Sequence, residues 1–286
     1  MRNRENGGRR GVGASRFLQR RWWDLSRFGL TPAKLLQRAR LRGRAGVLAV
    51  CVPKAGTHLL ERALCLQPGF YRPLVRTVNR GNVHALGGLE SLLARLKGGQ
   101  VLPAHVPWSA EAQAAASRAG VRLLFLIRDP RDILVSDVFY IMRTPGHPQH
   151  RLIAGLPSLR ERLLARITGN VEYRLEPMDE MLEAYSGWLD SPALTLRFED
   201  LVGPAGGGSG AAQQRVLASL QVHLDPDGKA GWGGLAGLLH SDLSPTFHRG
   251  LIGRWREHFD SEVKEAFKKA AGWSLARYGY EAGGDW

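Results

Sequence analysis

Three short segments of this chain combine basic side chains with a turn or a helix start, and each could bind an anion. The first, Pro53–His58, has the sequence PKAGTH and follows an apolar run typical of a buried strand. A lysine, a glycine and a hydroxyl at a helix start offer positive charge and free backbone N–H groups to one anion. The loop is P-loop-like, but its lysine precedes its single glycine, unlike the loops that bind nucleoside triphosphates.

The second segment has the sequence RDP and begins at Arg128, after another apolar run. Its aspartate suits the N-cap of a helix, and its proline suits the first turn. Ser136 lies about two turns along that helix. Arg128 and Ser136 could therefore reach one anion near the helix start; the alternative is an ion pair between Arg128 and Asp132.

The third segment, FHRGLIGRW, contains His248, Arg249 and Gly250. Basic side chains beside glycines suit a flexible lid that closes over negative charge. A solvated basic turn is an equally good interpretation of this segment taken alone.

His105 lies in the sequence AHVP, directly after the weak apolar run Gln100–Ala104. An imidazole with a pKa of about 6.5 is largely neutral at pH 7 and can accept a proton. This residue is a candidate general base, although a single histidine before a proline is more often structural.

Strands that alternate with helices must position these segments. We expect strands at 46–52, 100–104, 121–127 and 193–198, and helices at 58–66, 131–143, 158–167, 178–189, 211–220 and 261–271. This order predicts an α/β fold, with one central parallel sheet flanked by helices on both faces. Ligands then bind beyond the carboxyl ends of the strands. Irregular loops are expected at 144–157 and at 203–210, the latter as a surface insertion.

Composition divides the chain into a basic extension at 1–45, a single domain at 46–281 and a short tail at 282–286. The first 46 residues carry 13 of the 40 Lys and Arg residues against two acidic residues, and so +11 of the net charge of +14. The segment 16–44 mixes basic and aromatic residues. Peripheral contact with a membrane or a polyanion is one interpretation, and helices packed on the core are the other.

The sequence offers no pattern for a metal site or a membrane span. Cys51 and Cys65 are expected to be buried thiols, without a CxxC motif or a nearby histidine pair. The apolar stretches fall short of the ~20 residues that a spanning helix needs. No secretory signal pattern is visible, so we expect a cytoplasmic protein, with an organellar transit peptide left open.

The motifs PKAGTHLL, RDPRDILVS, RFEDL and FHRGLIGRW, in this order and spacing, resemble those of sulfotransferases that use 3′-phosphoadenosine-5′-phosphosulfate (PAPS), from about Gly46 to Tyr280. The resemblance implies that the first motif is the phosphosulfate-binding loop and surrounds the 5′-phosphate and sulfate with Lys54, Ala55, Gly56, Thr57 and His58. It implies that Arg128 and Ser136 bind the 3′-phosphate, and that Arg249 and Gly250 belong to a C-terminal phosphate loop.

AHVP resembles the THLP segment that supplies this family's general base. The resemblance therefore implies that His105 deprotonates a hydroxyl acceptor, a small molecule or a glycan or lipid. Lys54 would stabilise charge on the bridging oxygen during in-line transfer, and neither a metal nor a nucleic acid would take part. The chain departs from the family pattern at Leu59, Phe198 and His248, where many members have Trp, Tyr and Arg.

Two other functions are consistent with parts of the sequence. A nucleotide-dependent kinase would explain a phosphate loop, but the Walker spacing and an evident magnesium-binding pair of aspartates are missing. A non-enzymatic protein that binds a polyanion or a membrane would explain the basic extension, and its affinity would fall steeply with salt.

Overall fold

The computed structural model describes residues 44–73, 76–226, 232–239, 250–281 and 286, together with Leu25, Thr31, Pro32 and Leu36. The helices expected within 16–44 lie largely outside the described residues, and so do His248 and Arg249. The predictions for those positions stay predictions.

A five-stranded parallel sheet with the strand order β2-β3-β1-β4-β5 forms the centre of the fold. The strands are β1 (Val47–Cys51), β2 (Val78–Asn79), β3 (Val101–His105), β4 (Arg122–Ile127) and β5 (Leu194–Arg197). Every residue of the central strand β1 is buried, as expected for a strand covered on both faces. The prediction of a parallel sheet is thus confirmed, and β2 is a strand that the sequence reasoning missed.

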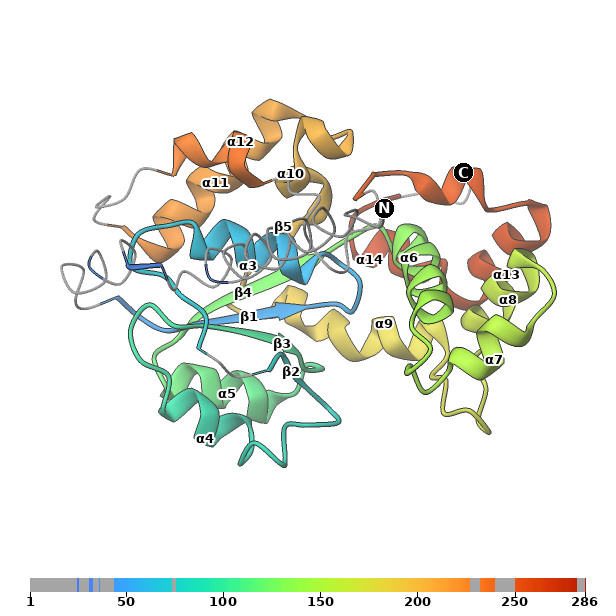
Figure 1. The fold of residues 1–286 in the computed structure, drawn as a ribbon, viewed down its shortest axis with the longest axis horizontal. Coiled ribbons are helices and arrows are strands. Elements are labelled where there is room, and N and C mark those ends of the chain that lie inside the picture. The colour runs from blue at the N-terminus through green and yellow to red at the C-terminus, as the bar shows by residue number, and fades with distance from the viewer. Residues whose placement is uncertain are drawn as a thin grey trace, which may run out of the picture.

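Helices cover both faces of the sheet and also gather beyond one of its ends. Figure 1 shows α3, α10, α11 and α12 on one face, α4 and α5 on the other, and α6, α7, α8 and α13 beyond the end of the sheet. The bounds are α3 Thr57–Cys65, α4 Leu89–Ala94, α5 Ala110–Arg118, α6 Pro130–Arg143, α7 His150–Gly155, α8 Leu159–Thr168, α9 Met178–Ser186, α10 Phe198–Val202, α11 Gly210–Leu224, α12 Ala236–Leu239, α13 Ser261–Ala271 and α14 Trp273–Arg277.

The start of α6 follows the predicted capping chemistry. The carboxylate of Asp129 accepts a hydrogen bond from the backbone N–H of Arg131 at 2.9 Å, and Pro130 occupies the first turn. Both cysteines are buried, as predicted, and burial raises the pKa of the Cys51 thiol to about 12. This thiol is therefore protonated at neutral pH.

Several boundaries differ from the predictions. The strand expected to reach Phe198 ends at Arg197, because Phe198 begins α10. The expected loop 144–157 contains α7. The helix expected to continue to residue 189 ends at Ser186, and the 3₁₀ turn η1 (Gly187–Asp190) follows it.

The glycine-rich loop 203–210 is more than a surface insertion. Gly206 is buried, and its carbonyl oxygen accepts a hydrogen bond from the backbone N–H of Ile252 at 3.1 Å. A Cβ atom on Gly206 would lie 2.7 Å from the carbonyl oxygen of Gly250. Glycine is therefore needed where this loop supports the segment that begins at Gly250.

In the described part of the chain, no helix is both long enough and apolar enough to cross a membrane.

Candidate functional site

The loop between β1 and α3 has a backbone conformation that opens the start of α3. Lys54 and Gly56 both have positive φ, 68° and 107°. A Cβ atom at Gly56 would lie 2.6 Å from Cδ2 of Phe198, so the approach of that ring requires glycine. No side-chain hydrogen bond caps α3, and a helix has no earlier turn whose carbonyl oxygens could accept from its first N–H groups. The start of α3 can therefore bind an anion.

Two other residues of this loop, Ala55 and His58, have contacts within the protein that the sequence did not indicate. Ala55 is fully buried, and its N–H donates to the carbonyl oxygen of Val52 at 3.0 Å, so this N–H is engaged within the loop. The ring of His58 lies beside Glu61, with Nδ1 3.3 Å from Oε2. Glu61 in turn forms a buried ion pair with Arg72 at 2.6 Å. The imidazole of His58 thus interacts with Glu61 on the same helix.

Arg128, at the end of β4, joins this loop to the C-terminal part of the chain. Its guanidinium is buried and donates to the carbonyl oxygens of Lys54, at 3.4 Å, and of Leu251, at 3.0 Å. It lies over the ring of Phe198, with Cζ 4.4 Å from the ring centroid. Its buried Nε–H has no partner in the described part of the chain. A buried donor without a partner is costly, so this group is a candidate for binding a ligand.

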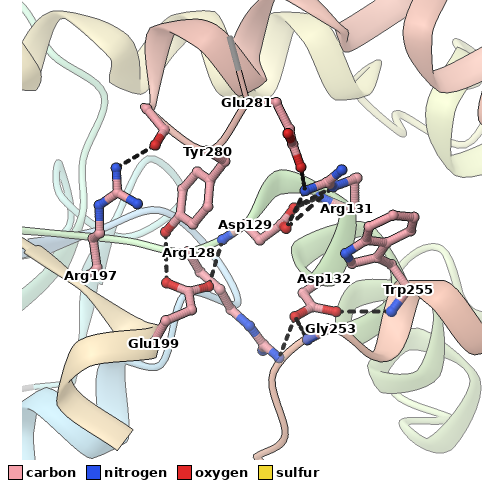
Figure 2. A network of polar contacts seen from close by, with 11 residues as sticks. Arg128, Asp129, Arg131, Asp132, Arg197, Glu199, Gly253, Trp255, Tyr280 and Glu281 are labelled. Atoms are coloured by element: carbon pink, nitrogen blue, oxygen red, sulfur yellow. Dashed lines mark hydrogen bonds and ion pairs between the residues drawn. The ribbon is translucent and has the colours of Figure 1, made fainter. Parts of the chain in front are cut away.

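The ion pair between Arg128 and Asp132, the alternative interpretation, also forms, at 3.7 Å. Asp132 has closer partners, because its two carboxylate oxygens accept from the backbone N–H groups of Gly253 at 2.7 Å and Trp255 at 3.0 Å. Figure 2 shows these contacts meeting at one carboxylate. Asp132 therefore mainly anchors the segment that follows Gly250, and Arg128 can still donate a hydrogen bond to a further acceptor.

Ser136 lies on α6 one turn after Asp132 and one turn before Tyr140. Residues four positions apart share a helix face, so Asp132, Ser136 and Tyr140 follow one another along α6. Asp132 lies beside Arg128, and the ammonium of Lys54 lies 3.5 Å from the centroid of the Tyr140 ring. The two predicted phosphate-binding clusters are thus brought together on the same side of the sheet.

The ammonium of Lys54 is held in a poorly solvated and electropositive place. Its pKa is lowered to about 8, mainly by burial, with Asp137 acting to raise it and Arg143 and Arg128 acting to lower it. An anion that entered this space would find a concentrated positive potential, because few solvent molecules screen it.

His105, the last residue of β3, has the geometry of a general base. Its Nδ1 lies 2.9 Å from the carbonyl oxygen of Cys51, which can only accept, so Nδ1 carries the hydrogen. The lone pair is then on Nε2, which lies 3.5 Å from Oγ1 of Thr57. Burial lowers the pKa of this imidazole, and the positive charges of His58 and Lys54 lower it further, against the hydrogen bond to Cys51. His105 is therefore neutral at pH 7.

A buried polar network, which sequence reasoning missed, fixes the end of β4 (Figure 2). The carboxylate of Glu199 accepts from the backbone N–H of Asp129 at 2.9 Å and from Oη of Tyr280 at 2.7 Å. Asp129 also pairs with Arg131 at 2.8 Å, and Arg131 reaches Glu281 at 3.1 Å. The alternating charges of RDPRD and the acidic residues of RFEDL were the signal that could have indicated it. The network sets the position of Arg128.

We expect Asp129→Asn to destabilise the fold by about 3–5 kcal/mol, because it leaves the buried Arg131 guanidinium without its main carboxylate partner. Urea unfolding measures this change. Glu90→Gln removes the exposed pair with Arg118 and should leave the unfolding midpoint unchanged. Equal midpoints for the two variants would contradict the role given to the network.

Of the remaining predicted site residues, Gly250 has positive φ, 54°, and lies against Gly206. Leu59 packs against the core. In the described part of the chain, no group of three or more His, Cys, Asp or Glu residues could hold a metal ion.

Comparison with known proteins gives similarity to sulfotransferases. No family model matches the chain. It is 23% identical over 249 residues to Sulfotransferase 2A6 of Mus musculus, covering 78% of this chain and 81% of that protein. It is 24% identical over 259 residues to 3-alpha-hydroxysteroid sulfotransferase of Cavia porcellus, covering 81% and 84%. The fold is similar to that of mouse sulfotransferase SULT7A1 complexed with PAP, with a TM-score of 0.55 at 16% identity, covering 88% of this chain and 94% of the other.

Proposed function

We propose that this chain is a member of the sulfotransferase family and transfers a sulfuryl group from PAPS to a hydroxyl group of a small-molecule acceptor. The observation that supports this most is the meeting of Lys54, Arg128 and the uncapped start of α3, with Arg128 donating to the carbonyl oxygen of Lys54 at 3.4 Å. Such a space suits one ligand with two separate anionic groups.

The residues present fit this ligand. The uncapped start of α3, together with Thr57 and Lys54, would hold the 5′-phosphosulfate. The unpartnered Nε–H of Arg128, with Ser136, would hold the 3′-phosphate. His248, Arg249 and Gly250 would complete the 3′ side. When bound, PAPS supplies the activated sulfuryl group.

His105 would accept the proton of the acceptor hydroxyl at Nε2, because Nδ1 is committed to Cys51. Thr57, 3.5 Å from Nε2, would help to orient the imidazole toward the phosphosulfate loop. The ammonium of Lys54 would stabilise negative charge that develops on the leaving side. Both groups are positioned before the ligand binds, so little reorganisation accompanies the reaction.

Calorimetric titration with adenosine 3′,5′-bisphosphate (PAP) and with AMP tests the donor. We expect PAP to bind about 100-fold more tightly than AMP, because each charge-assisted hydrogen bond to the 3′-phosphate contributes about 1.5–3 kcal/mol. Equal affinities would contradict the proposal. An activity that needs Mg²⁺ and ATP would favour the kinase instead.

We expect Arg128→Ala to weaken PAP binding by about 10- to 100-fold, through the loss of one charged contact. Calorimetry measures the affinity, and thermal unfolding checks the fold. Arg122→Ala is the matched control, since Arg122 is an exposed arginine at the opposite end of the same strand. Unchanged PAP affinity in Arg128→Ala would remove this residue from the proposed site.

The affinity for PAP should fall as the pH rises past about 8, because the pKa of Lys54 is lowered to about 8. Below that pH the ammonium is present and attracts the anion, and above it the neutral amine does not. Calorimetry between pH 7 and about pH 9.5 measures the decline, a range in which the arginines stay charged. In Lys54→Met the decline should disappear; a decline of the same size would assign it to another group.

A further inference from the structure

A cavity lies on a part of the molecule whose lining includes none of the proposed phosphate-binding residues. Its volume is about 470 Å³, within the range of small-molecule sites. It is formed by the end of α9, the turn η1, the helix α14 and the loop after β3, and the residues that line it are Trp108, Glu183, Ser186, Gly187, Asp190, Trp273 and Arg277. None of these residues belongs to the site proposed above.

Two partly exposed tryptophans face this cavity. Trp108 and Trp273 keep 41% and 38% of their surface exposed, although indoles are usually covered in a folded protein. Two contacts hold Trp108 in place. Its ring packs so closely on Gly187 that a Cβ atom there would lie 2.4 Å from Cδ2, and its Nε1–H donates to Gln113 at 3.1 Å. The backbone N–H of Trp108 also donates to the carbonyl oxygen of Ala184 at 2.8 Å. This wall of the cavity is therefore formed before a ligand binds.

The charges that line the cavity leave one carboxylate in excess. Arg277 is engaged with Asp190, through Nη1 to Oδ1 at 3.1 Å, and with the carbonyl oxygen of Ser186 at 3.1 Å. The hydrogen bond from Arg277 lowers the pKa of Asp190, so this pair is ionised and internally neutral. Glu183 is exposed and forms no hydrogen bond or ion pair within the described residues. The cavity thus carries about one negative charge, in a chain whose net charge is +14.

We propose that this cavity binds a small alkylammonium ion. Indole rings attract a cation through the negative charge of their faces, and they also cover the alkyl groups that surround it. Glu183 supplies the opposite charge. An anion is disfavoured, because the one arginine that lines the cavity is already paired with Asp190.

Titration of the full chain with tetramethylammonium, followed by NMR of the indole Nε1–H signals, tests this proposal. We expect signals of Trp108 and Trp273 to shift with a Kd in about the millimolar range, which corresponds to about −4 kcal/mol. The uncharged tert-butanol, of similar size, should bind at least about fivefold more weakly, since it lacks the cation–π attraction. Equal binding of the two molecules would overturn the proposal, and so would the absence of shifts.

Three variants separate the parts of the site. Trp273→Leu keeps apolar volume but removes a ring face, and Glu183→Gln removes the charge. Each should weaken tetramethylammonium binding by about fivefold or more. Glu180→Gln, on the same helix but outside the cavity, is the matched control and should bind as the unchanged chain does. Unchanged binding in either Trp273→Leu or Glu183→Gln, in proteins with unchanged thermal unfolding, would overturn the assignment.

Discussion

In His105→Ala, we expect turnover to fall by about 10²–10⁴-fold, the usual contribution of a positioned general base. The reason is geometric. The Nδ1–H of His105 is bound to the carbonyl oxygen of Cys51 at 2.9 Å, so the lone pair that can accept the acceptor's proton is on Nε2, which lies 3.5 Å from Oγ1 of Thr57. The measurement is steady-state sulfuryl transfer from PAPS to a working hydroxyl acceptor.

Two controls distinguish a lost base from a damaged fold. PAP affinity should stay nearly unchanged in His105→Ala, because the proposed contacts to the nucleotide come from other residues. His223→Ala removes a histidine of α11 that is similarly bonded to a backbone carbonyl, that of Leu123 on β4 at 3.0 Å. It should retain full turnover. Wild-type turnover in His105→Ala would disprove the assignment of the base and leave the fold assignment intact.

In Lys54→Met, we expect turnover to fall by about 10²–10³-fold, because the change removes a preorganised positive charge and keeps the shape of the side chain. The effect should be large, since the ammonium is mostly desolvated and its interactions with a ligand are weakly screened. Single-turnover kinetics at saturating PAPS separates this loss from weaker binding.

The matched control is Lys97→Met, at an exposed lysine outside the site, which should leave the rate unchanged. Tyr140→Leu provides a further comparison, because it removes the ring under the Lys54 ammonium and leaves the charge. It should lower the rate by less than Lys54→Met does. A Lys54→Met protein with the unchanged rate of the chemical step would contradict the role given to this ammonium.

The local units of the fold could be predicted from the sequence because neighbouring residues determine them. The apolar run before Lys54 and the run before Arg128 became β1 and β4 of one parallel sheet. Asp129 capped α6 as its type and position indicated. Parallel strands bring their carboxyl ends to the same edge, so the proximity of Lys54 and Arg128 also followed from the pattern.

Contacts between distant segments could not be predicted in this way. Arg128 donates to the carbonyl oxygen of Leu251, 123 residues further along the chain, and no local pattern specifies that partner. The same holds for Asp132, whose oxygens accept from Gly253 and Trp255, and for Gly206, which the composition of its loop suggested to be a surface glycine.

The sequence by itself determined the α/β class, the parallel sheet, the start of α6 and the residue types that can bind anions. The tertiary structure decided which ring nitrogen of His105 carries the lone pair, to which carbonyl oxygens Arg128 donates, and that Trp108 and Trp273 share a cavity with Glu183. The physical reason is range. Hydrophobic periodicity and capping act over a few residues, whereas hydrogen-bond partners and cavity walls depend on how distant segments pack once the core has formed.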